Sequence, residues 1–260
     1  MTKFIYKPKG KAQEYSPWAC NLYNGCSNQC SYCYNRHSQA KGLLGADTVS
    51  PRKSDGKPLS EDESFEIFKK ELDRYLDEII TDGGLHFSFV SDPCLPETYK
   101  LNLRCIEYAI SQGVNVQLLT KCAEWPFYPE WDEFLRFFSS ACPDLHECLS
   151  IGFTLTGCDE LEGNAPSNAK RIDTMALIHN NYRLKTWASI EPVIDLDRAF
   201  DVIRYASKYC DHFKIGLLSG KRDYTPEEVR VFMHKVESEL KDKSFIWKRS
   251  VLEFIDKIVK

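Results

Sequence analysis

The feature that most constrains the fold of this 260-residue chain is a regular alternation of strand-like and helix-like segments. Short runs rich in β-branched and aromatic residues are each followed by a stretch with apolar residues at helical spacing. Such alternation predicts right-handed βαβ units and a parallel sheet, because consecutive parallel strands are joined by a crossover that is usually a helix. The expected strands are 85–92, 114–120, 147–156, 184–192 and 212–218, and the stretch 244–250 also looks extended.

The expected helices occupy the stretches between these strands. Ser60 and Glu63 form a capping-box pattern at the start of the first helix, which ends at the Asp-Gly-Gly of 82–84. A doubly wound sheet is less favoured, because no G-x-G-x-x-G follows the first strand. With a strand leading into the loop of 26–33, about six βα units predict an α/β fold, a partial (β/α)6 TIM-type barrel with a parallel sheet. The other expected helices are 99–112, 130–139, 165–181, 196–209, 226–240 and the last residues of the chain.

Composition fits one globular domain rather than a disordered or membrane-spanning chain. Hydrophobic residues make up 43% and charged residues 28%, and no apolar run reaches the length of a membrane span. We expect a single domain over 1–260, with a core of about 15–220 and a C-terminal extension of about 221–260. Residues 1–15 lack an apolar h-region, so we expect no signal peptide. Eleven cysteines, an odd number, favour reduced thiols and metal binding in the cytoplasm over disulfides.

The charge balance disfavours non-specific binding of nucleic acid. The chain has 34 Lys and Arg against 38 Asp and Glu, a net charge of −4, whereas such binders usually carry a basic excess. Lys-Arg pairs beside aromatic residues at 221–222 and 248–249 are the local exceptions. Such pairs can contact phosphates and stack bases, or can be ordinary surface.

Cys26, Cys30 and Cys33 form the most specific motif of the chain, with the spacing C-x3-C-x2-C. Three thiolates in one loop can hold three irons of a [4Fe–4S] cluster and leave the fourth iron open to another ligand. A structural zinc site with Cys20 or His37 as the fourth ligand is the alternative. Zinc motifs usually come as two pairs, and no second C-x2-C occurs in the chain.

The cysteine spacing, with Tyr32 before the third cysteine, resembles the signature of radical SAM enzymes. Three later segments, SDPCLPE of 91–97, TK of 120–121 and GNAP of 163–166 before a helix with an arginine, extend the resemblance over roughly 15–220. In this order they look like the spore photoproduct lyase group, also described as DNA repair photolyase-like. The resemblance implies a [4Fe–4S] cluster, S-adenosylmethionine (SAM) on its open iron, and a reductase, flavodoxin or ferredoxin as electron donor.

The resemblance also implies roles for single residues at the ends of the expected strands. The three cysteines would hold the cluster, and Asp92 would meet the SAM amino group, since a carboxylate pairs well with a buried ammonium. Lys121 would meet the SAM carboxylate as a point charge. The remaining residues expected to bind SAM are Tyr32, Ser91, Ser150 and Glu191.

One departure from the photoproduct lyase pattern concerns the hydrogen donor. That group has a cysteine just before its Ser-Asp motif, where this chain has Phe89 and Val90. Cys94, Cys122 and Cys158 instead follow three successive strands, so we hypothesise that at least one donates a hydrogen atom or binds an auxiliary metal. Three buried structural cysteines are the alternative.

The function expected from these motifs is hydrogen abstraction by a 5′-deoxyadenosyl radical. Family analogy favours a nucleic acid or nucleotide as the substrate, which would be repaired or modified. A radical SAM enzyme acting on a peptide or small metabolite is a second hypothesis. A zinc-stabilised binding module without redox chemistry is the third.

Overall fold

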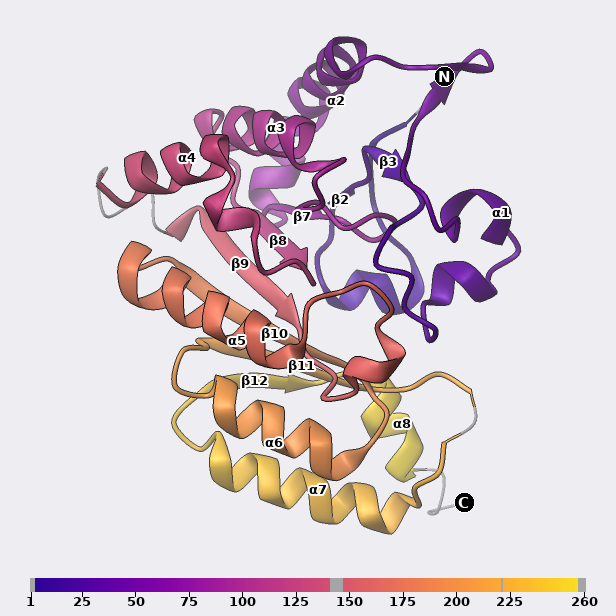
Figure 1. Ribbon diagram of the computed structural model, residues 1–260, viewed down its shortest axis with the longest axis vertical. Helices are drawn as coiled ribbons and strands as arrows, with labels where there is room; N and C mark the ends of the chain where they lie inside the picture. The colour runs from indigo at the N-terminus through magenta and orange to yellow at the C-terminus, as the bar shows by residue number, and fades with distance from the viewer. Residues whose placement is uncertain (1–2, 141–146, 221, 257–260) are drawn as a thin grey trace.

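The computed structural model describes residues 3–140, 147–220 and 222–256. Its centre is an eight-stranded sheet in which the first two strands are antiparallel and every later neighbouring pair is parallel (Figure 1). The strands in spatial order are β1 (Ile5–Tyr6), β2 (Ala19–Cys20), β7 (Leu85–Phe87), β8 (Val116–Thr120), β9 (Leu149–Thr154), β10 (Lys185–Val193), β11 (His212–Leu217) and β12 (Ser244–Trp247).

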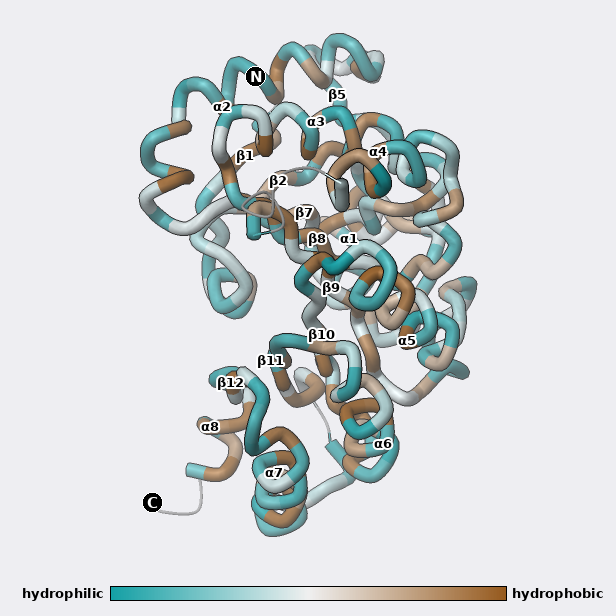
Figure 2. The backbone as a smooth tube through the Cα atoms, turned by 90° about the vertical axis from the view of Figure 1, so that its left-hand side faces the viewer, coloured by the Kyte–Doolittle hydropathy of each residue, from teal (hydrophilic) through white to brown (hydrophobic). Residues whose placement is uncertain are grey.

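The sheet is an open partial barrel, because β1 and β12 stand at its two edges and do not pair with each other. Figure 2 shows the curve of the sheet from β1 and β2 at one end to β12 at the other. The predicted α/β partial barrel with a parallel sheet is therefore confirmed. Each strand from β7 to β12 is followed by a helix, and β12 with its helix belongs to the predicted C-terminal extension.

Helices cover the outer face of the sheet (Figure 1). Their buried positions recur at helical spacing, as Phe68 and Leu72 do in the first long helix, which carries the predicted Ser60–Glu63 capping box. These side chains join one continuous core with outward-facing strand residues such as Phe87 and Leu118. The helices are α2 (Glu61–Thr81), α3 (Tyr99–Ser111), α4 (Pro129–Ser140), α5 (Asn168–Leu177), α6 (Leu196–Ala206), α7 (Pro226–Glu239) and α8 (Arg249–Asp256).

Two predicted boundaries differ from the structure. The helix expected from residue 165 begins at Asn168, after Ser167 caps it by accepting a hydrogen bond from the Lys170 N–H. Its last turn, Ile178–Tyr182, is a π-helix. The expected loop of 41–59 contains a short helix, α1 (Lys41–Leu44), and three two-residue strands, β4 to β6.

The described members of the two Lys-Arg pairs make contacts within the fold. Lys221 lies outside the described residues, and Arg222 donates to the Leu218 carbonyl at 2.6 Å. Lys248 is only 1% exposed and forms an ion pair with Glu191. In the part of the chain that the structure describes, no helix combines the length and the apolar character needed to cross a bilayer.

Candidate active site

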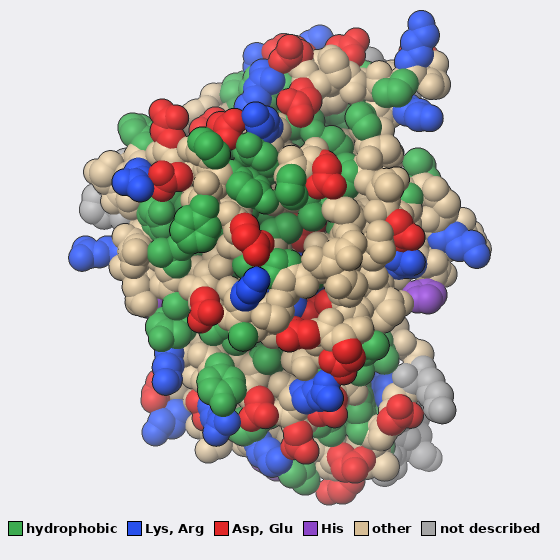
Figure 3. Space-filling model, viewed as in Figure 1, with side chains coloured by type: hydrophobic (Ala, Val, Ile, Leu, Met, Phe, Trp, Pro, Cys, Tyr) green, Lys and Arg blue, Asp and Glu red, His purple; other side chains and the backbone are tan. Residues whose placement is uncertain are grey.

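A cavity of about 650 Å³ opens at the C-terminal ends of the parallel strands. Its wall combines the cysteine loop, the residues that follow β7 and β8, the end of β10 and the N-terminal segment that ends at Tyr15. Because it lies at this edge of the sheet, the cavity is where the active sites of such barrels are found. On the face shown in Figure 3, acidic and basic side chains are interspersed over the helices.

The three motif cysteines lie in one irregular loop between β3 (Tyr23–Asn24) and the 3-10 helix η2 (Tyr34–His37). Cys26, Cys30 and Cys33 all line the cavity. Within the described ranges, no three His, Cys, Asp or Glu side chains are arranged as ligands of one metal ion. A [4Fe–4S] cluster does not require that arrangement, because each cysteine binds a different iron.

The cysteine thiols are held in a poorly solvated environment. Burial, followed by the neighbouring Asp92, raises the pKa of Cys26 to about 12, and burial raises the pKa of Cys30. A metal centre reverses this preference, since its positive charge stabilises the thiolate that binds it. Of the two candidate fourth ligands for zinc, His37 lines the cavity, whereas Cys20 lies fully buried in β2.

Asp92, predicted to bind the SAM amino group, joins three parts of the cavity wall. Its Oδ1 accepts hydrogen bonds from the Cys94 N–H at 3.0 Å and the Thr120 hydroxyl at 2.6 Å. Its Oδ2 accepts from the Asn28 amide at 3.0 Å and the Lys121 N–H at 2.7 Å. A carboxylate offers about four acceptor sites, so this one holds the cysteine loop and the ends of β7 and β8 together.

Ser91 and Lys121 present polar groups to the cavity that the described residues leave unused. Ser91 is 7% exposed, and its hydroxyl has no hydrogen-bond partner. The Lys121 ammonium forms no ion pair with any residue that the structure describes, and lies 5.6 Å from the ring centre of Tyr32. Burial opposes the charge of Lys121, but the nearby Cys30 and Glu162 outweigh it and raise the pKa of Lys121, so the ammonium is charged at neutral pH.

Glu191 lines a different part of the cavity wall. Its Oε2 accepts the Tyr15 hydroxyl at 2.6 Å and forms the ion pair with Lys248. The Tyr15 oxygen also lies 2.7 Å from Ser189 Oγ, and the Lys248 ammonium lies 3.9 Å from the Tyr15 ring centre. Sequence reasoning missed Tyr15, because nothing in the pattern of residues 10–15 shows that this segment returns to β10.

The structure does not bring Ser150 to the cavity. Ser150 is the second residue of β9, at the N-terminal end of the strand, where it pairs with Gln117 and Lys185. Side chains of alternate strand residues share a face, and Thr154, four residues further on, is the one that lines the cavity. A SAM contact from Ser150 has no support in this position.

The three cysteines considered as hydrogen donors are likewise absent from the described cavity wall. Cys94 is fully buried and Cys122 is 5% exposed, and both pack in the hydrophobic core. Cys158 is 2% exposed and directly precedes the short 3-10 helix η5 (Asp159–Leu161), without a side-chain capping hydrogen bond. Burial raises the pKa of all three thiols, as it does for Cys26 and Cys30, so position in the fold and not protonation separates the two sets of cysteines.

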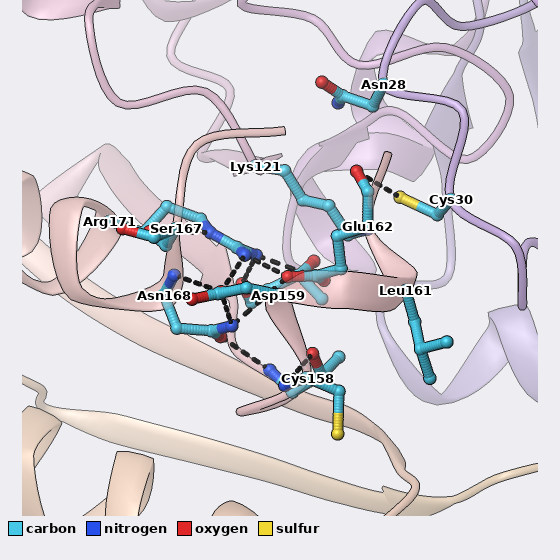
Figure 4. Close-up of polar contacts among 12 residues, drawn as sticks. Asn28, Cys30, Lys121, Cys158, Asp159, Leu161, Glu162, Ser167, Asn168 and Arg171 are labelled. Atoms are coloured by element: carbon cyan, nitrogen blue, oxygen red, sulfur yellow. Dashed lines mark hydrogen bonds and ion pairs between the residues drawn. The ribbon is translucent and has the colours of Figure 1, made fainter. Parts of the chain in front are cut away.

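Sequence reasoning also missed a buried ion pair behind the cysteine loop (Figure 4). Glu162 and Arg171 have no exposed side-chain surface and form a salt bridge. The Glu162 carboxylate accepts the hydroxyl of Tyr32, whose side chain lines the cavity. The motif resemblance pointed to an arginine in this helix, but the spacing of 162 and 171 alone does not pair them.

No protein-family model matches the chain. An uncharacterized protein of Methanocaldococcus jannaschii is 25% identical over 94% of this chain and 86% of its own length. Spore photoproduct lyase complexed with dinucleoside spore photoproduct matches 95% of this chain and 79% of its own, with a TM-score of 0.61 at 13% identity. SuiB of Streptococcus suis, bound to S-adenosylmethionine, matches 86% of this chain with a TM-score of 0.56 at 10% identity.

The chain has the partial-barrel fold of spore photoproduct lyase and SuiB. It spans about half the length of SuiB, of which it covers 48%. The fold agrees with the group that the sequence motifs resemble, and the cavity wall fits the two groups that the resemblance implies. Three cysteines face one cavity, the Ser91 hydroxyl is buried without a partner, and the Lys121 ammonium is unpaired among the described residues.

Proposed function

We propose that this chain is a radical SAM enzyme that holds a [4Fe–4S] cluster through Cys26, Cys30 and Cys33. The observation that carries the proposal is the convergence of these three cysteines on one cavity at the C-terminal edge of a partial barrel. The cluster, when bound, supplies one electron for reductive cleavage of SAM into methionine and a 5′-deoxyadenosyl radical that takes a hydrogen atom from the substrate.

The side chains of the cavity would bind and orient SAM. The Lys121 ammonium, which has no ion-pair partner among the described residues, would bind the carboxylate of SAM, and the Ser91 hydroxyl would form a hydrogen bond with the same end of SAM. Asp92 keeps these groups in place through its four hydrogen bonds, and a contact with the SAM amino group would replace one of them, because a carboxylate offers about four acceptor sites. The apolar part of the wall, which includes Phe89 and Leu119, would exclude water from a reactive intermediate.

We further propose an anionic substrate, namely a nucleotide or nucleic acid. The described cavity wall carries five basic side chains and two carboxylates. Arg36 and Lys248 form ion pairs with Asp47 and Glu191, which leaves three lysines of the wall without a carboxylate partner among the described residues. Such local concentration of positive charge attracts phosphates. Spore photoproduct lyase has been solved with a dinucleoside photoproduct, and SuiB with its precursor peptide. A peptide substrate is therefore the alternative, and an experiment must distinguish it from a nucleic acid. The basic residues are Lys9, Lys11, Arg36, Lys121 and Lys248.

The first experiment tests the chemistry without a known substrate. The chain is reconstituted anaerobically with iron and sulfide, reduced with dithionite in the presence of SAM, and assayed for 5′-deoxyadenosine. We expect a brown protein with about four irons per chain and slow formation of 5′-deoxyadenosine. A colourless protein with stoichiometric zinc would instead establish the zinc-binding module.

The second experiment tests the substrate class. Binding of a fluorescent single-stranded oligonucleotide and of an unrelated acidic peptide is measured at low and high salt. Oligonucleotide binding that weakens steeply with salt supports the nucleic-acid proposal. Equal, weak binding of both probes would count against it.

A further inference from the structure

The loop that follows β9 lies directly against the cysteine loop. The Ser31 N–H donates to the Leu161 carbonyl at 2.9 Å, and the Asn164 N–H donates to the Asn28 carbonyl at 2.9 Å. The Asn164 amide reaches the Ser27 carbonyl at 3.0 Å. Backbone groups of the cysteine loop, which belongs to no helix or strand, are therefore satisfied by residues more than a hundred positions later in the chain.

The two loops approach too closely at Gly163 for any side chain. A Cβ added there would lie 2.5 Å from the Asn28 carbonyl oxygen and 2.8 Å from that of Gln29. Gly163 also has φ +55°, in the left-handed region that glycine adopts most readily. The contact between the loops thus depends on a glycine for two separate reasons.

The second loop is anchored from behind by the Glu162–Arg171 ion pair (Figure 4). Arg171 also donates to the Thr154 carbonyl at the end of β9 at 2.5 Å, which ties the pair to the sheet. Asn168, at the start of α5, donates to the Glu162 carboxylate at 3.2 Å. Both charged side chains are fully buried, so the geometry of the pair has little freedom to change.

Glu162 also contacts the cysteine loop through two of its own groups. Its carboxylate accepts the Tyr32 hydroxyl, and its backbone carbonyl lies 3.8 Å from the Cys30 Sγ. One residue therefore connects a rigid ion pair of the barrel to the second cysteine of the motif and to the aromatic residue before the third.

We propose that the segment from Gly157 to Asn168, anchored by the Glu162–Arg171 ion pair, is a template that holds the cysteine loop in its cluster-binding shape. Glu162 is the positioning residue of this template. The inference rests on the proposed function, since it concerns the site of the [4Fe–4S] cluster. A loop without regular structure loses conformational entropy when it binds a ligand, and a preformed partner surface lowers that loss before the ligand arrives.

Two variants disturb the template in different ways, and each has a matched control. Gly163→Ala separates the loops and leaves the ion pair intact, whereas Gly56→Ala has a similarly positive φ but no atom within 4 Å. Glu162→Gln removes the buried charge, whereas Glu160→Gln removes the exposed partner of Arg198 from the same loop. The measurements are iron and sulfide per folded chain after anaerobic reconstitution, and the electron paramagnetic resonance spectrum of the reduced cluster with and without SAM.

We expect wild type and both controls to hold about four irons per chain, and Gly163→Ala and Glu162→Gln to hold about one or fewer. A role in stability alone would lower the melting temperature but leave the iron content and spectrum of the folded fraction unchanged, and that result would overturn the inference. If Glu162→Gln does not fold, Gly163→Ala decides, because it retains the ion pair. A wild-type chain that takes up no cluster would instead refute the proposed function, and the template with it.

Discussion

The Tyr15 hydroxyl donates a 2.6 Å hydrogen bond to the Glu191 carboxylate, which joins the N-terminal segment to β10 across the interior of the barrel. Three further contacts hold the same segment: Lys214 to the Tyr15 carbonyl, Lys11 to Ser219, and the Arg249 N–H to Glu14. These contacts tie the N-terminal segment to β10, to β11 and the residues that follow it, and to the start of α8.

Tyr15→Phe is predicted to destabilise the fold. The change removes only the hydroxyl, and the buried Ser189 and the partly buried Glu191 lose a hydrogen-bond partner. We expect the free energy of unfolding to fall by about 1–3 kcal/mol, measured by urea titration. Tyr205→Phe, at a side chain that is 57% exposed, should have almost no effect, and equal stability of the two variants would refute the interpretation.

The cysteines are predicted to divide into two classes. Alanine at any one of Cys26, Cys30 or Cys33 should abolish the absorbance of the cluster near roughly 400 nm and most of the bound iron. Alanine at Cys94 or Cys122, which pack in the core, should leave about four irons per chain and lower stability only. Loss of iron from the Cys94 or Cys122 variants would show that a thiol outside the motif binds metal.

Lys121→Met is predicted to weaken SAM binding without loss of the cluster. The variant keeps the apolar stem but removes an ammonium that has no ion-pair partner among the described residues. We expect the Kd of the reconstituted protein for SAM to rise about tenfold, measured by anaerobic calorimetry. Lys100→Met removes a lysine of an exposed ion pair with Glu130 and serves as the control. An unchanged Kd in Lys121→Met would remove Lys121 from the site.

Lys214 is predicted to make stability rise with pH. Burial, and then the nearby Lys248, lower the pKa of Lys214 from 10.5 to about 8. Between these two values the unfolded chain holds a proton that the folded chain has lost, so raising the pH favours folding by up to about 3 kcal/mol from this group. Below about pH 8 the lysine is charged in both the folded and the unfolded chain, so burying the charge lowers the free energy of unfolding by its full amount.

The test compares wild type with Lys214→Met by urea unfolding across this pH range. The variant has no charge to bury, so its stability relative to wild type should be greatest at neutral pH and decline as the pH rises toward 10.5. A difference that does not change with pH would mean that Lys214 keeps its ordinary pKa in the folded protein.

Local patterns predicted the elements of the barrel well. The Ser60–Glu63 capping box and the helical spacing of Phe68 and Leu72 are properties of neighbouring residues, so the start of α2 could be read from the sequence. The boundary of α5 could not, because the residues before Asn168 leave the helix to contact the cysteine loop. The hydrophobic periodicity of a segment does not show where tertiary contacts will end a helix.

The candidate site was predictable in part for the same reason. Residues that directly follow parallel strands, such as Asp92 and Lys121, reach the C-terminal edge by topology alone, and both line the cavity. Ser150 and Cys94 were predicted to face the cavity but do not line it. Whether a side chain reaches the cavity depends on how far along the strand its residue lies and on which face the side chain occupies.

By itself, the sequence determined the alternating α/β architecture and the three cysteines of the motif, since periodicity and ligand spacing are local properties of the chain. Only the tertiary structure decided which distant groups meet: Tyr15 with Glu191, and Glu162 with both Arg171 and Tyr32. A buried charge or hydroxyl must find a partner within hydrogen-bond distance, and the fold of the whole chain decides which residue that partner is.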